Sequence, residues 1–486
     1  MSTAMSLTVL SNDQICGLLE SLSHDEAQEL TDTLRNALHE YSTGTQSIKD
    51  GIVHQPERIS VHSNTTGTTT LFMPSISTLG HAVKVVTLSS PSADKSADTA
   101  LPPIRPTGSV TIYSPQGPPI GFLHAKTLTA FRTALASSCL LAKRASVRTL
   151  VVFGSGLQAY WHMRLALMLR GDTIRQVYII NRSFSESAKD TFKKIYGISK
   201  DIKQREGWEQ AQFSLLTQTY GDYGRLLKEH LREADVIYCC TPSTEDLFDA
   251  SILTSHEGRR KGRLIIAIGS YTKQMRELPR ELLLQAVKTH TLGHHYHKHA
   301  TEGGVIIVDT LDGALKEAGE IIEAGLEPTQ LVELGELAMI HRLAKEEEEA
   351  LISQSSTEAS SINESLEKLD LASPGSAMST VFGSESGNSA SGNGGKRSSS
   401  RSPSRRSSSS RSLPFHHRQS SSQGTVDEQR QKQQQAGHDH HLARWLSAGN
   451  VIYKSVGLGL MDLVVGFEVI RLAKERGLGS HIEGFS

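Results

Sequence analysis

The sequence lacks the features that mark secreted, membrane-spanning and nucleic-acid-binding proteins. Its 486 residues include four cysteines, whose spacing fits neither a disulfide framework nor a metal site. It has no run of about 18 apolar residues, and its first residues lack the charged and apolar regions of a signal peptide. Lys and Arg number 51 against 52 Asp and Glu, so no net charge attracts nucleic acid or a membrane. We therefore expect a cytoplasmic protein without a bound metal, built from about two or three domains.

A glycine-rich turn is the most informative feature that is present. An apolar run is followed by G-S-G-L-Q-A, which has the pattern G-x-G-x-x-A at the start of an expected helix. Gly154 would permit the tight turn, Gly156 would let the backbone approach a pyrophosphate, and Ala159 would let helix and strand pack closely. The phosphates would lie on the helix N-terminus. The expected cofactor-binding residues of this turn are Gly154, Ser155, Gly156, Leu157 and Gln158.

The end of the next strand predicts which cofactor is used. The strand at 176–180 is followed by Asn181, Arg182 and Ser183. An NAD site usually has an acidic residue there, which accepts a hydrogen bond from the ribose 2′-hydroxyl. A neutral amide and a cation suit the 2′-phosphate of NADP instead. We expect these three residues to contact the cofactor, with NADP(H) preferred and NAD(H) as the alternative.

Strands and helices alternate from the glycine turn onward, which predicts a parallel, doubly wound α/β sheet. Nearer the N-terminus, Ser11 and Ser23 each begin a capping box for a helix, and three strands are expected between residues 58 and 87. The strands expected after the turn lie at 176–181, 212–217, 234–240, 263–268 and 304–309.

The composition changes sharply in the C-terminal third. Residues 353–441 are rich in Ser, Arg and Gln, with an Arg/Ser run at 397–412. Few large apolar residues are available there to offset the entropy of ordering, so we expect this insert to be disordered. The Arg/Ser run is a candidate kinase substrate or docking tail, and a solvated linker is the alternative. A connecting helix is expected at 326–352 before the insert.

Several short motifs follow one another in a fixed order. They are Q-P-x-R at 55–58, L-F-M-P at 71–74, V-K-V-V-T at 83–87, L-T-A-F-R-T-A at 128–134, V-V-F-G-S-G-L-Q-A-x-x-H at 151–162, I-N-R-S at 180–183, A-D-V-I-Y-C-C-T-P-S at 234–243, I-A-I-G-S-Y-x-x-x-x-R-E-L at 266–278 and K-S-V-G-x-x-x-x-D at 454–462. In this order they resemble the ornithine cyclodeaminase/mu-crystallin family, and its mu-crystallin-like ketimine reductases more than its true cyclodeaminases.

The resemblance implies a Rossmann dinucleotide-binding domain inserted into an α/β substrate-binding and dimerisation domain. It also implies a homodimer with NAD(P)-linked chemistry at the carbon that bears an amino acid's nitrogen. The expected parts are 1–146 as the N-terminal part of the substrate domain, 147–325 as the Rossmann domain, 326–352 as the connecting helix, 353–441 as the insert and 442–486 as the C-terminal return to the substrate domain.

Three basic residues match positions where the family binds the substrate carboxylate: Arg58, Lys84 and Arg132. Arginine can hold a carboxylate through two hydrogen bonds, whereas lysine acts as a point charge. Arg132 lies in an apolar helix and must be paired, so a structural ion pair is its alternative role. Lys84 stands among valines in a strand, and we expect both a substrate-binding and a catalytic role for it. Arg58 could also be an ordinary surface residue.

The main departure from the cyclodeaminase pattern is Tyr271. True cyclodeaminases have an Asp at the matching position, which serves as acid and base, and a further acidic residue where this chain has Leu71. A tyrosine, with an ordinary pKa of about 10, can donate a proton but is a poor base near neutral pH. The substitution favours imine reduction over cyclodeamination. Tyr271 could be catalytic, or it could form an aromatic wall or serve only in packing.

The remaining candidates lie at the ends of later strands. Thr241 lies where open sheets bind cofactors, and Ser455, Val456 and Gly457 are expected near the nicotinamide or the domain boundary. Asp462 could orient Lys454 or the substrate, or cap a helix. Two histidine-rich stretches, at 294–299 and 438–441, are interpreted as polar segments rather than metal sites.

Together these features predict an enzyme that uses NADPH to reduce the C=N bond of a small cyclic ketimine or imino-carboxylate. The first alternative is an ornithine cyclodeaminase or an amino acid dehydrogenase. The second is a catalytically inactive protein that binds NADP. The expected partners are the small-molecule substrate, a second copy of the chain and a kinase for the insert.

Overall fold

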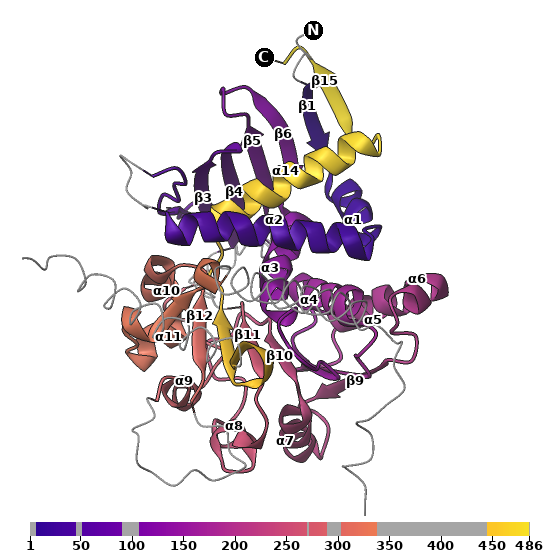
Figure 1. Ribbon diagram of the computed structural model, residues 1–486, viewed down its shortest axis with the longest axis vertical. Coiled ribbons are helices and arrows are strands. Elements are labelled where there is room, and N and C mark those ends of the chain that lie inside the picture. Colours follow the sequence, from indigo (N-terminus) through magenta and orange to yellow (C-terminus); the bar gives the residue numbers. More distant parts are fainter. Residues whose placement is uncertain are drawn as a thin grey trace, which may run out of the picture. The chain divides into compact units, whose positions relative to one another are not determined.

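The computed structural model describes residues 6–44, 51–89, 106–269, 272–288, 303–337 and 445–485 (Figure 1). The chain divides into two units, 1–342 with 438–486 and 343–437. The second unit lies outside the described residues, as do Tyr271, the insert at 353–441 and the histidines of 294–299. The described residues of the first unit form two β-sheets.

The first sheet is mixed and has the strand order β15-β1-β6-β5-β4-β3-β2. Neighbouring strands are antiparallel, except β1 and β6, which are parallel. The three strands predicted between residues 58 and 87 are confirmed as β2, β3 and β4. The strands are β1 (Ser6–Leu10), β2 (Ile59–Ser63), β3 (Thr68–Ser77), β4 (Gly80–Ser89), β5 (Thr107–Tyr113), β6 (Pro119–His124) and β15 (Ser480–Glu483).

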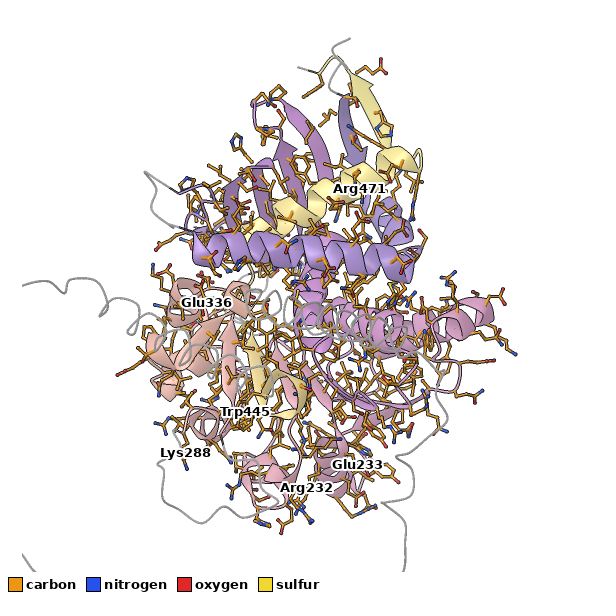
Figure 2. The ribbon with its side chains drawn as sticks, viewed as in Figure 1. Arg232, Glu233, Lys288, Glu336, Trp445 and Arg471 are labelled. Atoms are coloured by element: carbon orange, nitrogen blue, oxygen red, sulfur yellow. The ribbon has the colours of Figure 1, made fainter. Side chains whose placement is uncertain are left out.

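Helices cover one face of this sheet. They are α1 (Asn12–Glu20), α3 (Ala125–Leu141) and α14 (Gly459–Glu475), and α2 (His24–Thr43) packs in turn on α3 and α14. Both predicted capping boxes are confirmed at the starts of α1 and α2. Helix α14 contacts β3, β4, β5 and β6 and turns polar residues outward, among them Arg471, which pairs with Glu468 and Glu475 (Figure 2).

The opposite face of the first sheet exposes apolar side chains. Ile59 pairs with Phe72, which pairs in turn with Val85, so the three side chains share a face. Ile59 is 59% exposed and Phe72 is 37% exposed. Phe122 on β6 is also exposed.

The second sheet is parallel throughout, as predicted, with the order β13-β12-β14-β11-β10-β7-β8-β9. The chain first builds outward from β7 to β9 and then returns to β10 on the other side, so the order reverses between β7 and β10. The strands are β7 (Thr149–Phe153), β8 (Gln176–Asn181), β9 (Gln212–Thr217), β10 (Val236–Cys239), β11 (Leu264–Ala267), β12 (Val305–Val308), β13 (Leu331–Glu333) and β14 (Val451–Lys454).

Helices connect these strands, and the longer helices α3 and α4 pack against each other to link the two halves. Helix α3 packs against α2 and α14 on one side and against α4 on the other. Among the described residues, no helix is both long enough and apolar enough to cross a membrane. The helices of this half are α4 (Leu157–Arg170), α5 (Glu186–Gly197), α6 (Lys200–Arg205), α7 (Tyr223–Glu233), α8 (Ser251–Thr254), α9 (Arg280–Ala286), α10 (Leu311–Glu317) and α11 (Gly319–Ala324), with 3₁₀ turns η1 (Gly258–Arg260), η2 (Pro328–Gln330) and η3 (Leu334–Glu336).

The prediction of a connecting helix at 326–352 is wrong for residues 326–337, the part of this range that the structure describes. Residues 328–336 form η2, the short strand β13 and η3. Strand β13 extends the sheet by pairing with β12, and η3 packs so closely on α2 that a Cβ on Gly335 would lie 2.0 Å from the Leu38 carbonyl oxygen. Tertiary contacts with the sheet and with α2 outweigh the local helical preference.

The C-terminal segment does not return to the first sheet as one piece. Strand β14 inserts between β11 and β12 of the second sheet, which corrects the assignment of all of 442–486 to the substrate domain. All four residues of β14 are buried, and a continuous apolar run is typical of a strand covered on both faces. The chain then crosses to the first sheet, where α14 and β15 complete it (Figure 1). This crossing places residues 455–462 between the two halves.

Candidate active site

Many of the predicted site residues directly follow strands of the second sheet, at the edge where the carboxyl ends of these parallel strands lie. Phe153, Cys239, Ala267, Lys454 and Val308 occupy one row of the register across five neighbouring strands. The residues that follow each of them therefore begin at one edge, and this edge includes the point where the strand order reverses. Ligands of open α/β sheets bind at such points.

The glycine turn has the geometry that a pyrophosphate needs. Gly154 has a φ of +97°, and a Cβ there would lie 3.0 Å from the Cys240 carbonyl oxygen. A Cβ on Gly156 would meet nothing within 4 Å, so a ligand can approach the backbone there. Gly156 caps α4 without a side-chain hydrogen bond, which leaves the first-turn N–H groups available for an anion. These residues fit a dinucleotide.

Other predicted contacts lie around this turn. The side chain of Asn181 donates to the Ser183 carbonyl oxygen, at 2.9 Å, and to Ser185. Arg182 is exposed and has no partner among the described residues. The hydroxyls of Ser155 and Ser187 lie 2.9 Å apart. Leu157 and Gln158 are half-buried in the first turn of α4, and Gln158 Oε1 is buried there without a hydrogen-bond partner in the described chain.

The three predicted cations are brought together between the two sheets. Lys84 on β4 is buried, and its Nζ lies 2.5 Å from Asp462 Oδ2 on α14. Arg132 on α3 is also buried, with its Nε 3.3 Å from Asp462 Oδ1. Arg58 donates to the Val456 carbonyl oxygen at 3.2 Å and forms an ion pair of 2.6 Å with Glu317. Asp462 therefore orients Lys84 and Arg132, rather than Lys454 as one of the expectations had it.

Burial changes the acidity of three members of this cluster, and it lowers the pKa of Arg58, which the negative charge of Glu317 opposes. It lowers the pKa of Lys84 to about 8, although the nearby Asp462 carboxylate opposes the shift. Burial also raises the pKa of Glu317, which the positive charge of Arg58 counteracts. Below pH 8 the cluster thus holds Lys84 as an ammonium, and above pH 8 it loses that charge.

The segment that crosses between the sheets is fixed by Asp309, which directly follows β12. Its carboxylate accepts from the Ser455 hydroxyl and from the Gly457 N–H, both at 2.7 Å, and from the Tyr453 hydroxyl. The Ser455 hydroxyl is therefore already committed within the protein. Gly457 has a φ of +83°, and a Cβ there would lie 2.8 Å from the Arg132 guanidinium.

Two buried carboxylates at this edge were not predicted as site residues. Asp309 ends an apolar strand, and that position at the carboxyl end of a strand was a usable signal. Glu277 lies in a loop after β11 and gave no such signal. It accepts from the backbone and the hydroxyl of Thr241, so the side chain of Thr241 points towards Glu277.

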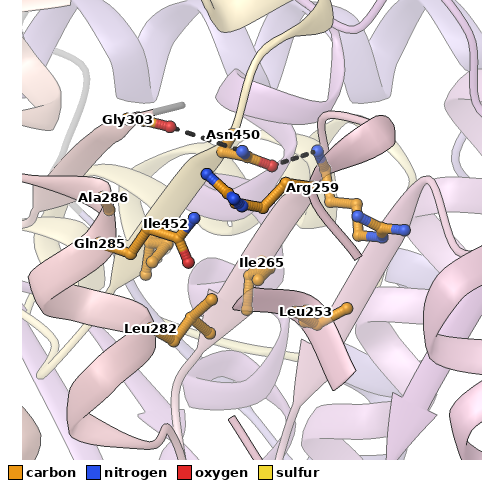
Figure 3. Close-up of a pocket in the computed structure, with 10 residues that line it drawn as sticks. Leu253, Arg259, Ile265, Leu282, Gln285, Ala286, Gly303, Asn450 and Ile452 are labelled. Carbon is orange, nitrogen blue, oxygen red and sulfur yellow. Dashed lines mark hydrogen bonds between the residues drawn. The ribbon is translucent and has the colours of Figure 1, made fainter. Parts of the chain in front are cut away.

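A small pocket at the opposite edge of the sheet is not a cofactor site (Figure 3). It lies at the amino ends of β11 and β14, where the Asn450 side chain bonds to Gly303 and Arg263. Its volume is about 20 Å³, which is enough for a single water molecule.

Comparison with known proteins agrees with this geometry. Residues 19–208 match the model of the ornithine cyclodeaminase/mu-crystallin family. Over these residues the chain is similar to this family. The matched residues include all three cations and the glycine turn, which lie in the region that the family model describes.

Individual relatives match only part of the chain or are distant from it in sequence. An uncharacterised protein of Saccharomyces cerevisiae is 30% identical over 254 residues, covering 47% of this chain and 63% of that protein. The ketimine reductase mu-crystallin of Mus musculus is 26% identical over 332 residues, covering 65% and 85%. The structure of Thermococcus litoralis Delta(1)-pyrroline-2-carboxylate reductase in complex with NADH and L-proline shares the fold, with a TM-score of 0.54 and 16% identity over 97% of this chain and 99% of that one.

Replacing Asp462 by Asn tests the ion-pair cluster. The substitution leaves two buried cations without their shared carboxylate, so we expect the free energy of unfolding in urea to fall by about 3–5 kcal/mol. The matched control is Asp222→Asn, which breaks an exposed pair with Arg225 and should leave the urea midpoint unchanged. Equal midpoints for the two variants would contradict a shared role of Asp462.

Proposed function

We propose that the protein uses a nicotinamide cofactor, NADPH in preference to NADH, to reduce the C=N bond of a small cyclic ketimine or imino-carboxylate. The charge balance of the buried cluster carries this proposal. Arg58, Lys84 and Arg132 supply three positive charges, whereas Asp462 and Glu317 supply two negative charges. Lys84 and Arg132 share the single carboxylate of Asp462, so this buried pair has one positive charge left over, which a substrate carboxylate would neutralise.

The arrangement at the edge of the sheet supports the same assignment. The glycine turn follows β7, and the crossing segment follows β14, three strands away in the sheet. At a spacing of about 4.8 Å between strands, the two are separated by about 14 Å. A dinucleotide that lies along this edge, with its pyrophosphate at α4, would direct its nicotinamide towards β14 and the cations.

The residues of the chain can each be given a task in this reaction. Bound nicotinamide supplies the hydride. Arg132 and Lys84, held by Asp462, would bind and orient the substrate carboxylate, and the hydride would add to the carbon of an iminium whose nitrogen already carries its proton. Fixing both reactants in an attack geometry can lower the barrier by about 7–11 kcal/mol.

The remaining proposals concern partners and compartment. The four cysteines are free thiols, which supports a reducing, cytosolic compartment. A kinase acting on the Arg/Ser run is proposed on composition alone.

We further propose that the protein is a homodimer and that the exposed apolar face of the first sheet is the contact between the two copies, because an exposed apolar patch of this kind is unfavourable in water.

The catalytic proposal is tested by NADPH oxidation with piperideine-2-carboxylate, with NADH, and with ornithine plus NAD, in parallel. We expect turnover with NADPH and the ketimine, and a loss of at least about 100-fold in kcat/KM in Arg132→Ala because the carboxylate loses its bidentate partner. Activity with ornithine would favour the cyclodeaminase alternative. Tight binding of NADPH without turnover would favour the non-catalytic one.

The pH dependence of this activity should report on Lys84. Since the ammonium form is required, kcat/KM should fall about tenfold per pH unit above a pKa of about 8. In Lys84→Arg the cation stays charged, so the fall near pH 8 should disappear even where activity is reduced. An unchanged pH profile in Lys84→Arg would assign the titration to another group.

The cofactor preference is tested at Arg182. Arg182→Asp removes the cation expected at the 2′-phosphate and adds an acceptor for a ribose hydroxyl, so kcat/KM should shift from NADPH towards NADH by about 10- to 100-fold. Arg205→Asp, on α6, is a control for general charge effects. A preference that is the same in Arg182→Asp and the parent protein would contradict the assignment.

The dimer is tested by placing a charge on the apolar sheet face. Phe72→Glu should halve the molar mass measured by light scattering, because a carboxylate cannot be buried unpaired in an apolar contact. Ile322→Glu, a residue of similar exposure on α11, should leave the mass unchanged. A monomeric parent protein would refute the dimer.

A further inference from the structure

Glu277 is a wholly buried carboxylate that the proposed reaction does not use. Its side chain is 0% exposed. Oε1 accepts from the Thr241 N–H at 2.7 Å and from the Thr241 hydroxyl at 3.0 Å. Oε2 accepts from the Gly269 N–H at 2.6 Å. One carboxylate therefore connects the loops that follow β10 and β11.

These two loops adjoin the glycine turn. A Cβ on Gly154 would lie 3.1 Å from Cγ2 of Thr241, and a Cβ on Gly269 would lie 2.0 Å from the Thr241 carbonyl oxygen. Thr241 is thus packed between Gly154 and Gly269, and Glu277 fixes it through hydrogen bonds from its N–H and its hydroxyl. A shift of Thr241 would change the shape of the turn that receives the pyrophosphate.

The charges around Glu277 make its protonation state important. Burial raises the pKa of Glu277 to about 7, and the positive charge of Lys454 and the two backbone N–H donors oppose this shift. Lys454 on β14 also pairs with Glu320 on α11, at 3.3 Å. The thiols of Cys239 and Cys240 on β10 are the other titratable groups nearby, and burial raises the pKa of both.

We propose that Glu277 is a positioning residue for the cofactor, which as a carboxylate holds Thr241 and Gly269 in the backbone shape that a bound dinucleotide requires. The ionised form accepts all three hydrogen bonds and is an acceptor only, whereas protonation or an amide adds a hydrogen-bond donor at one of the two oxygen positions that face these donors. The inference rests on the proposed function, since it presumes that a dinucleotide binds at this edge.

Titration calorimetry of Glu277→Gln with NADPH tests this role directly. The amide keeps the size of the side chain but sets its NH₂ against one of the three donors. We expect binding to weaken about 10- to 100-fold at pH 8, the range for loss of a hydrogen bond to a buried charged group. Glu333→Gln is the matched control, because Glu333 is buried at the edge of the same sheet and accepts from the Leu311 N–H. It should bind NADPH as the parent protein does.

A pH series separates positioning from a loss of folding. The ratio of the dissociation constants of Glu277→Gln and the parent protein should fall towards one as the pH drops through about 7, because the parent protein then loses its carboxylate as well. The comparison cancels the titration of the cofactor's own phosphate. A ratio that stays constant from pH 6 to 8.5 would overturn the positioning role.

The outcomes distinguish this inference from the proposed function. A parent protein that binds neither NADPH nor NADH would overturn both. Binding by the parent protein that is unchanged in Glu277→Gln would overturn the inference alone. Where Glu277→Gln does not fold, Thr241→Val and Thr241→Ser replace it: the serine variant keeps the hydroxyl and should bind NADPH several-fold more tightly than the valine variant. Equal affinities of these two would also overturn the role of Glu277.

Discussion

The shared carboxylate of Asp462 is the constraint on which the site depends. Lys84 and Arg132 come from a strand and a helix of the N-terminal segment, and both are buried beside each other. Two unpaired cations in such a position would repel each other and could not be desolvated at acceptable cost. Asp462, more than 300 residues later in the chain, makes their burial tolerable. The C-terminal segment is therefore required for the site as well as for the fold.

The crossing from β14 to α14 satisfies this requirement. Because β14 is a central strand of the second sheet, its position is fixed on both sides by parallel partners. The next residues are held by Asp309, and one turn into α14 the chain presents Asp462 to the cations of the first sheet. The same few residues thus connect the edge of the second sheet at the glycine turn with the proposed substrate pocket.

Much of this could be predicted from the sequence, for reasons that are local. The alternation of apolar strands with helices predicts the parallel sheet, and the two serine capping boxes predict the starts of α1 and α2. The cations were found because they match positions where the resembled family binds the substrate carboxylate, and a lysine among valines and an arginine in an apolar helix were further signals for two of them. The predictions that failed concern features that depend on contacts between segments far apart in the sequence. Residues 331–333 form a strand because β12 offers a partner, and the pairing of Asp462 with Lys84 requires a register between segments that no local pattern encodes.

The composition of the site also bears on which reaction it suits. Leu71 lies on the same face of β3 as Met73, which pairs with Lys84 in the sheet, so an apolar side chain occupies a position where the cyclodeaminases of the family carry an acid. Of the five charged groups in the cluster, both carboxylates are engaged in ion pairs and are poor free bases. An oxidation that starts from an ammonium substrate must remove a proton, whereas reduction of an iminium begins with that proton in place. A site that is rich in fixed positive charge and poor in free base is therefore better matched to reduction of a carboxylate-bearing imine than to its reverse.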